Sequence, residues 1–420
     1  MNKLDDINSM DFSSIPDDPF WNASTEKEDK MHRIHAYPAK FPAFITTKAL
    51  DFAKKKKLKI SRIADVFCGC GTVAYESKRN GINFWGCDIN PVATLVAKAK
   101  SYNYQKKYLD NYYQNVIQDF VTMRRNVVIN EVNERLTYWY DIDHYKELFV
   151  LKKAIENNIP KHSNYWSFFL CAFSNILRPT SRWLTKSIKP QIDPNKKPAD
   201  VIKTFESQCK FMISASSESN IKNKISTDIV TGNFLDDKIK RPEVDMIITS
   251  PPYVTSYEYA DLHQLSTLWL GYTSDYREFR EGSIGSLYHV YDFDEELKGL
   301  NTTGRIIVAE LINKYKSKAH SVAKYFLDMQ VAANKCYEMI IPGGMALFVI
   351  GNTEYKGVMI NNAKHLAESL QNSGFTKLYL TKRRIRQKNL TPYRNSLGRF
   401  SKNSDSRQVY NEEFILIGIK

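Results

Sequence analysis

The sequence has few cysteines, no long apolar run and no internal repeat. Six cysteines in 420 residues are too few for a disulfide scaffold, and they fit a reducing cytosol. No apolar run approaches the roughly 20 residues that are needed to span a bilayer. The first thirty residues are polar and acidic, without the basic start and apolar core of a secretory signal. We therefore expect a cytoplasmic protein that has no membrane partner.

The cysteines also form no metal-binding pattern. Cys68 and Cys70 make a C-x-C pair, but no second ligand pair follows at a suitable spacing. Both residues are better explained as small, buried side chains. We predict no metal site.

Positive charge, by contrast, is in excess. The formal net charge is +14 and the pI is near 9.2. Residues 178–198 hold six Lys or Arg and one Asp, a net charge of +5, and residues 382–407 hold nine and one, a net charge of +8. Such concentrated charge indicates a polyanion partner, of which nucleic acid is the commonest.

A short apolar run at residues 245–249 ends abruptly in Ser250-Pro-Pro-Tyr253. The run is typical of a buried strand, and the prolines end it because they donate no amide hydrogen and fix their own φ. The turn therefore presents a hydroxyl group, backbone carbonyls and an aromatic ring. Open α/β sheets bind their ligands at the carboxyl ends of strands, where this turn lies.

A second pattern lies earlier in the chain. Residues 60–67 are typical of a buried strand, and Cys68-Gly-Cys-Gly-Thr72 then leads into a helix through Lys78. A further strand, residues 83–87, ends on Asp88. Strand, glycine turn, helix, strand and acid follow each other as in a nucleotide-binding βαβ unit, with Asp88 about 20 residues beyond the glycines.

The remaining chain completes one sheet and one helical insertion. The apolar patterns predict seven strands, at residues 60–67, 83–87, 228–232, 244–249, 345–350, 375–380 and 413–419. The last two have no helix between them and should form an antiparallel hairpin at the edge of a mostly parallel sheet. Helical spacing predicts helices over residues 306–341 and 361–373, the second capped by Gly374.

We divide the chain into four parts. Residues 1–31 are expected to be a flexible arm with Phe20 and Trp21 as docking points, and residues 32–100 a cofactor-binding half. Residues 101–225 lack strand patterns and form the helical insertion, a candidate DNA-recognition region. Residues 226–420 form a catalytic half that includes the basic loop 382–407.

Three motifs resemble those of the S-adenosylmethionine-dependent DNA amino-methyltransferases. His35-Ala-Tyr-Pro-Ala-Lys-Phe-Pro42 resembles the amino-terminal cofactor motif, and Phe67-Cys-Gly-Cys-Gly-Thr72 resembles the F-x-G-x-G-T loop. Thr249-Ser-Pro-Pro-Tyr253 is similar to the catalytic turn of that family. The resemblance covers roughly residues 32–100 and 226–420, and it implies a Rossmann-like, seven-stranded methyltransferase sheet.

The resemblance also implies a set of site residues. Gly69 and Gly71 would admit the methionine part of S-adenosylmethionine, Asp88 would hold the ribose, and Ile89 would lie on adenine. Cofactor contacts are further implied for Tyr37, Lys40, Asp65, Phe67, Thr72, Asn233 and Phe234. Lys40 and Asp65 are the candidates for the amino-acid end, and each is equally well explained as structural. The catalytic turn comprises Ser250, Pro251, Pro252 and Tyr253.

These residue types suit methylation of an exocyclic amine. The lone pair of such an amine is drained into the ring, so catalysis needs acceptors that hold the amino hydrogens. The Ser250 hydroxyl and the Pro251 carbonyl are suitable acceptors, and the Tyr253 ring can stack on an extruded base. The sequence contains no Pro-Cys dipeptide, which argues against a cytosine-C5 mechanism.

By resemblance, serine at the first position of the turn favours cytosine N4, whereas Asp or Asn there would favour adenine N6. Adenine-N6 methylation, action on RNA, and a nucleic-acid-binding module that has lost turnover remain as alternatives. The resemblance also suggests a restriction-modification system with a separate cognate endonuclease.

The two basic windows are the candidate surfaces for duplex DNA, because charge and aromatic residues alternate in both. In the first window the candidates are Arg178, Arg182, Trp183, Lys186 and Lys189. In the second they are Arg383, Arg384, Arg386, Arg394 and Arg399, with Tyr393 between them.

Overall fold

The structure is a computed structural model. The structure describes residues 2–4, 7, 10–22, 27–129, 132–187, 189–219, 221, 224–254, 258–286, 288, 291–385, 393–394, 400–401, 407–408 and 412–420.

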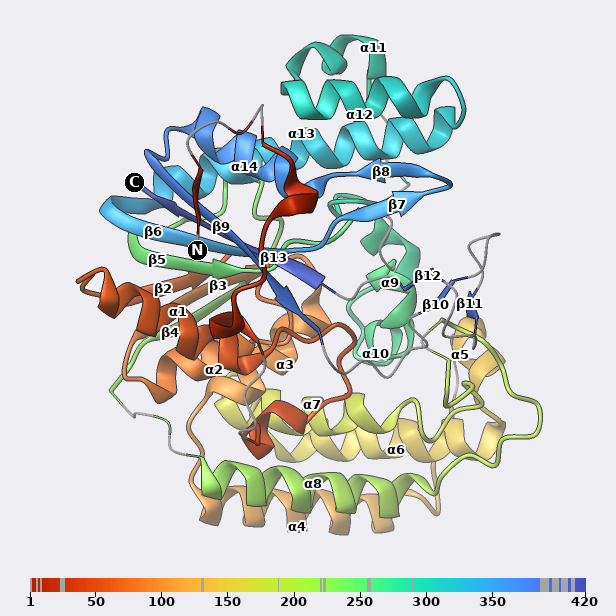
Figure 1. The fold of residues 1–420 in the computed structure, drawn as a ribbon. Coiled ribbons are helices and arrows are strands. Elements are labelled where there is room, and N and C mark those ends of the chain that lie inside the picture. The colour runs from red at the N-terminus through yellow and green to blue at the C-terminus, as the bar shows by residue number, and fades with distance from the viewer. Residues whose placement is uncertain are drawn as a thin grey trace.

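An eight-stranded sheet forms the centre of the molecule (Figure 1). Its order is β1 (Asn2–Leu4), β9 (Lys377–Arg384), β13 (Glu412–Ile419), β6 (Ile340–Ile350), β5 (Val244–Thr249), β2 (Arg62–Asp65), β3 (Asn83–Asp88) and β4 (Thr227–Thr231). The strands from β6 to β4 are parallel, whereas β13 is antiparallel to both β6 and β9. The predicted seven-stranded sheet with its antiparallel edge hairpin is confirmed, and β1 adds an eighth strand outside β9.

The chain reverses its direction of travel across the sheet at β2. From β2 it proceeds outward through β3 to β4, then returns to place β5 on the other side of β2. Such a switch point opens a crevice outside the carboxyl ends of the two strands. The glycine turn follows β2 and the Ser-Pro-Pro-Tyr turn follows β5, so both predicted motifs lie at this crevice.

Both faces of the sheet are buried, as a parallel sheet requires. Alternate residues of β5 point to opposite faces, with Ile247 in the core of one face and Ile248 in that of the other. The first face is covered by α12 (Thr302–Ile312), α13 (Lys316–Met339) and α14 (Asn362–Ser373). The second face is covered by α1 (Ala43–Lys55), α2 (Thr72–Arg79) and α3 (Pro91–Ser101), on the opposite side in Figure 1.

The predicted insertion is helical. It contains α4 (Lys106–Met123), α5 (Glu134–Trp139), α6 (Ile142–Asn158), α7 (Asn164–Ile176) and α8 (Val201–Glu218). These helices share a separate apolar core with α3 and with α10 (Gln264–Trp269), in which Trp139, Phe173 and Trp269 are buried. Figure 1 shows them as a further layer beyond α3. Through α10 this layer is joined to the segment that follows the catalytic turn.

The remaining elements are short. They are the helices α9 (Tyr259–Leu262) and α11 (Phe293–Glu296), the 3-10 turns η1 (Phe12–Ser14), η2 (Pro19–Trp21), η3 (Lys30–Arg33), η4 (Tyr276–Arg280) and η5 (Leu297–Gly299), the hairpin β7 (Thr353–Tyr355) and β8 (Val358–Ile360), and a small sheet of β10 (Tyr393–Arg394), β11 (Phe400–Ser401) and β12 (Arg407–Gln408). None of the helices in the described ranges is both long and apolar enough to cross a bilayer.

The prediction of a flexible arm at residues 1–31 is wrong for the part of the arm that the structure describes. β1 pairs with β9, and the Asp18 amide donates to the Lys382 carbonyl at 3.0 Å. Trp21 is 0% exposed, as a docking residue should be. The arm is held because β9 would otherwise be an edge strand with unpaired backbone groups.

The predicted helix over residues 306–341 is also wrong in its extent. It is two helices, α12 and α13, and β6 begins at Ile340 rather than at Met345. Gly343 has φ +81, and the register between β5 and β6 shifts between Val244 and Met246. Pro342-Gly343-Gly344 therefore forms an irregularity inside a longer strand, a place where glycine is common. The predicted α14 and its cap Gly374, at φ +109, are confirmed.

Candidate functional site

The glycine turn after β2 is locked onto the end of β3. The Gly69 amide donates to Asp88 Oδ2 at 2.8 Å, and the Asn90 amide donates to Asp88 Oδ1 at 2.9 Å. Gly69 and Gly71 have φ of +47 and +73, which only glycine adopts readily. A Cβ on Gly71 would lie 2.6 Å from Ala97 Cβ, so the turn also needs glycine in order to pack against α3.

Asp88 lies where a nucleotide-binding acid is expected. Burial raises the pKa of its carboxyl to about 6, although the two amide hydrogen bonds oppose this shift. The Tyr37 ring lies 3.8 Å from the position of a Cβ on Gly69, and burial, followed by the Asp88 charge, raises the pKa of Tyr37 well above its usual range. The structure therefore brings Tyr37, Gly69 and Asp88 together. Thr72 begins α2 directly behind the turn.

The predicted adenine contacts lie beyond Asp88. Asn233 Nδ2 donates to the Gly282 carbonyl at 3.3 Å, and a Cβ on Gly282 would lie 3.4 Å from Ile89 Cδ1. Ile89 and Asn233 therefore face the same loop. Phe234 is buried, and its ring centroid lies 6.1 Å from that of Phe67.

On the acceptor side, the Ser250 hydroxyl donates to the Val349 carbonyl of β6 at 2.9 Å. This bond uses the single hydrogen of the hydroxyl, so the oxygen is left with lone pairs that can accept. Pro251 is buried, and Tyr253 is half-buried. The turn thus has the acceptor character that holding an amine requires.

A hydrogen bond between the ends of β5 and β2 joins the Ser-Pro-Pro-Tyr turn to the glycine turn. Thr249 Oγ1, the last residue of β5, donates to Asp65 Oδ1 at the end of β2, at 2.6 Å. Asp65 is 3% exposed, and burial raises the pKa of its carboxyl to about 7. Asp65 therefore lies between the glycine turn and the catalytic turn.

Lys40 is held by other partners. Its ammonium group donates to Glu28 Oε2 at 2.6 Å and to the His32 carbonyl at 3.2 Å. These two bonds anchor the motif at residues 35–42 to the segment before it. Of the two candidates for the amino-acid end of the cofactor, Asp65 is the one that the structure places next to the glycine turn.

The Cys68 and Cys70 side chains pack in different apolar clusters, one against β3 and α2 and the other in the helical layer. Burial raises the pKa of the Cys68 thiol well above its usual range. The two sulfurs therefore do not converge on one ligand position. Among the described residues, no group of three His, Cys, Asp or Glu is arranged to hold a metal ion.

The first basic window differs from the prediction at Trp183. This side chain is 1% exposed, and its ring stacks on Trp139 with the centroids 4.8 Å apart. Its burial corrects the expectation of a surface aromatic residue, because the indole is part of the core of the helical layer. Arg178 lies over this ring at 4.7 Å, and Arg182 donates to the Tyr138 carbonyl at 2.7 Å. Lys186 and Lys189 are exposed.

The second basic window begins at the end of β9. Arg383 is 4% exposed and paired with Glu413, so it is not a surface residue, which corrects the prediction for it. Arg384 is exposed and paired with Asp17. The Arg394 backbone lies in β10, and Arg386 and Arg399 lie outside the described residues.

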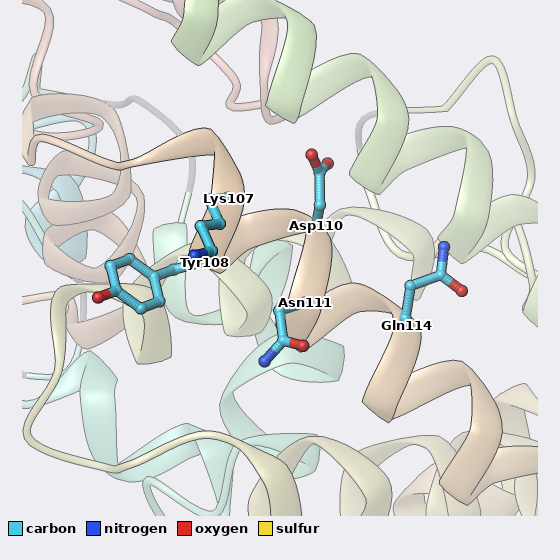
Figure 2. Close-up of a pocket in the computed structure, with 5 residues that line it drawn as sticks. All are labelled: Lys107, Tyr108, Asp110, Asn111 and Gln114. Atoms are coloured by element: carbon cyan, nitrogen blue, oxygen red, sulfur yellow. The ribbon is translucent and has the colours of Figure 1, made fainter.

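Figure 2 shows a pocket that has no part in this site. Its lining residues all belong to α4, and they are Lys107, Tyr108, Asp110, Asn111 and Gln114. Four of the five are exposed, on the side of α4 away from the buried face that carries Leu109 and Tyr113. The helical layer lies between this surface and the crevice.

Sequence reasoning missed two features of the site. Gly282 faces Asn233 and Ile89, while a Cβ on Gly285 would lie 3.8 Å from the Tyr253 carbonyl oxygen, so residues 282–285 run from the cofactor half to the catalytic turn. In the sequence these two positions are marked only by being glycines. In the structure both have φ above +70. The second feature is Glu413, which hydrogen bonds Tyr253 across 160 positions of sequence.

No protein-family model matches the chain. The chain is 22% identical over 422 residues to the Type II methyltransferase M.MvaI of Kocuria varians, covering 92% of this chain and 89% of that protein. It is 20% identical over 387 residues to the Type II methyltransferase M.BsoBI of Geobacillus stearothermophilus, covering 77% of this chain and 75% of that protein.

Two solved structures were also compared. The rRNA methyltransferase aviRa of Streptomyces viridochromogenes has a TM-score of 0.28 at 8% identity, over 95% of this chain and 96% of that chain. An S-adenosylmethionine-dependent methyltransferase of Clostridium acetobutylicum has a TM-score of 0.26 at 8% identity, over 89% of both chains. At these TM-scores the superpositions carry no argument, so the fold is assigned from the strand order. By its strand order the chain has a Rossmann-like fold, and along most of its length it is similar to two methyltransferases.

Proposed function

We propose that the chain is an S-adenosylmethionine-dependent methyltransferase that acts on the exocyclic N4 amine of cytosine in duplex DNA, at a specific short site. The observation that carries the proposal is the Ser250 hydroxyl, whose hydrogen is used by the Val349 carbonyl. While that bond is made, the oxygen offers its lone pairs as acceptors, and acceptors for the amino hydrogens are what this reaction needs.

Each part of the turn has a role in the proposal. Ser250 Oγ and the Pro251 carbonyl hold the amine hydrogens and favour a tetrahedral nitrogen, and the Tyr253 ring stacks on the extruded base. S-adenosylmethionine supplies an electrophilic methyl group when it is bound. Positioning is the main contribution of the chain, because a well-oriented pair of reactants needs little further activation.

The cofactor would lie along the carboxyl ends of β2, β3 and β4. The Asp88 carboxylate, fixed by two amides, would accept from the ribose hydroxyls, and Ile89 and Asn233 would contact the adenine. Gly69 and Gly71 allow the backbone to approach the methionine portion. Tyr37, Asp65, Phe67, Thr72 and Phe234 complete the proposed pocket, and Lys40 supports it from outside.

DNA is favoured as the substrate by two observations. Both curated relatives are Type II methyltransferases, and the chain carries a net charge of +14. Exposed lysines at 186 and 189 supply part of a surface for phosphates. A cognate endonuclease acting separately is proposed on the same similarity.

Adenine N6 is the second candidate, because a carbonyl and a hydroxyl can hold either amine. Serine at the first position of the turn favours cytosine, by resemblance to the family. RNA methylation and a binding module without turnover are further outcomes that the experiment below would detect.

The test is methyl transfer to DNA from labelled S-adenosylmethionine, followed by nucleoside mass spectrometry. We expect N4-methylcytosine, and we expect Ser250→Ala to lower kcat by about 100-fold, as loss of one preorganised hydrogen-bonding group does. Cofactor affinity should stay within about twofold, since Ser250 lies on the acceptor side.

Ser61→Ala is a matched control. Ser61 donates to Asp245 Oδ2 at 2.7 Å, at the opposite end of β5 from Ser250, so it tests loss of a serine hydrogen bond to the same strand. Its kcat should match that of the wild type. If the product is N6-methyladenine, the substrate is adenine and the proposed cytosine specificity is wrong. If the wild-type protein methylates none of a varied set of DNA substrates, the proposed function is overturned.

A further inference from the structure

The Tyr253 ring is held on two sides. A Cβ on Gly351 would lie 3.1 Å from Tyr253 Cε2, so the ring packs directly on the backbone that follows β6. Its hydroxyl donates to Glu413 Oε1 at 3.2 Å. The ring therefore has a packed face and an anchored tip, which together fix its plane.

Glu413 is itself held by a buried cation. Arg383 of β9 lies directly opposite Glu413 of β13 in the sheet register, and its Nη2 donates to Glu413 Oε2. The Arg383 side chain is 5% exposed, that of Glu413 is 17% exposed, and the guanidinium lies over the Phe44 ring at 5.6 Å. One oxygen of the carboxylate thus serves Arg383 and the other serves Tyr253, so a change at either partner is transmitted to the other.

The protonation of Tyr253 suits this role. Burial and the nearby Glu413 charge both raise the pKa of the Tyr253 hydroxyl well above its usual range. The hydroxyl remains a donor at any pH at which the enzyme would work.

The ion pair of Arg383 and Glu413 lies where β9 ends and β13 begins. Arg383 and Glu413 stand at the two roots of residues 385–411, which contain most of the second basic window. β9 runs parallel to β5 and β6, since each of β9 and β6 is antiparallel to β13, so these roots lie at the same edge of the sheet as Ser250. The carboxylate of Glu413 thus joins the end of β9 to the Ser-Pro-Pro-Tyr turn.

We propose that Glu413 is a positioning residue, which orients the Tyr253 ring for stacking on the target base and is itself fixed by Arg383. This inference rests on the proposed function, because it assigns the ring the task of holding an extruded base. It predicts that the hydroxyl of Tyr253, and not only its ring, contributes to turnover.

The experiment uses Tyr253→Phe and Glu413→Gln in the full chain, singly and together. Tyr253→Phe keeps the ring and removes the anchor, and Glu413→Gln keeps the shape of the side chain and removes the charge that Arg383 holds. We expect each change to lower kcat about tenfold, with the affinity for S-adenosylmethionine unchanged. Because both changes break one chain of contacts, the double variant should lose about tenfold as well, rather than about a hundredfold.

Glu412→Gln is the matched control. Glu412 is the preceding residue of β13 and pairs with Lys382 across the same hairpin at 3.1 Å. Its kcat should remain within about twofold of the wild type. Equal kcat values for Glu413→Gln, Tyr253→Phe and Glu412→Gln would overturn the inference, as would full additivity in the double variant.

A second readout separates positioning from a structural role. With 2-aminopurine in place of the target base, stacking on the Tyr253 ring quenches its fluorescence, and we expect Tyr253→Phe and Glu413→Gln to increase the emission from the bound complex. Unchanged emission would contradict the proposal even if Glu413→Gln folds poorly, since Tyr253→Phe leaves the ion pair in place. Wild-type protein that is inert on DNA overturns the proposed function, whereas active wild type with normal variants overturns only the role of Glu413.

Discussion

At the scale of single residues, the site is built around two carboxylates with different surroundings, the half-buried Asp88 and the buried Asp65. Asp88 accepts from two backbone amides, so its position is set by the turn of the chain. Asp65 accepts from the Thr249 hydroxyl and from the Phe67 amide. Asp65 thereby joins the carboxyl ends of β2 and β5, and we expect its burial to affect stability.

Asp65→Asn should change the pH dependence of stability. The pKa of Asp65 is raised from 3.8 to about 7, so the stability linked to its proton is fully present at low pH and is lost as pH rises through about 7. Relative to Asp65→Asn, which keeps an acceptor for Thr249, wild-type stability should fall by about 4 kcal/mol between about pH 4 and about pH 8. Urea denaturation across this range is the measurement.

Asp51→Asn serves as the control for Asp65→Asn. Asp51 is exposed on α1, and its replacement should leave the pH profile of the wild type unchanged. Parallel profiles for the wild type and Asp65→Asn would mean that the burial of Asp65 does not perturb its titration.

At the scale of elements, the stacked indoles of Trp139 and Trp183 hold the first basic window to the helical layer. Trp139 ends α5, and Trp183 follows α7 within residues 178–198. The Trp183 indole donates to the Ser187 carbonyl at 3.2 Å, which closes the segment on itself. The segment is therefore an ordered part of the layer, with Lys186 and Lys189 presented at its surface.

Trp183→Ala should consequently destabilise the protein. Removal of a buried tryptophan costs about 3–5 kcal/mol through lost burial and the cavity left behind. Thermal or denaturant unfolding would measure the loss, and Trp183→Phe should recover part of it. A variant with normal stability but weakened DNA binding would instead return Trp183 to the surface role that the sequence suggested.

At the scale of the whole molecule, some of the positive side chains have protein partners and others are exposed to solvent. Arg383 and Arg384 are paired with acids, and Arg178 and Arg182 donate to backbone carbonyls. The net charge of +14 is therefore not all available to a partner. Exposed lysines such as Lys186 and Lys189 carry the part that can meet phosphates.

The double variant Lys186→Gln, Lys189→Gln should reduce the salt dependence of DNA binding. Each phosphate contact contributes about 0.9 to the slope of log affinity against log salt concentration, so the slope should fall by about 2. Binding titrations at several salt concentrations would measure it. Lys107→Gln, on the exposed side of α4, should leave the slope unchanged, and equal slopes for all three proteins would exclude the first window from the DNA surface.

The two motifs of the site could be predicted because their signals are local. A glycine turn between a strand and a helix, an acid at the end of the next strand, and two prolines that end a strand each follow from the conformational limits of a few consecutive residues. The seven strands and the antiparallel hairpin followed from apolar patterns in the same way. That the glycine turn and the proline turn share one crevice follows from the general rule for parallel sheets.

Tertiary structure decided the environment of residues whose partners are distant in the sequence. The amino-terminal segment is packed because β9 offers it an unpaired edge, Trp183 is buried because Trp139 lies beside it, and Arg383 is neutralised because Glu413 is its cross-strand partner. None of these contacts has a local pattern, since the two partners in each are separated by tens or hundreds of residues. The sequence determined where the glycine turn, Asp88 and the Ser-Pro-Pro-Tyr turn lie, because their signals are local, and the packing of the folded chain decided which charges and rings remain exposed.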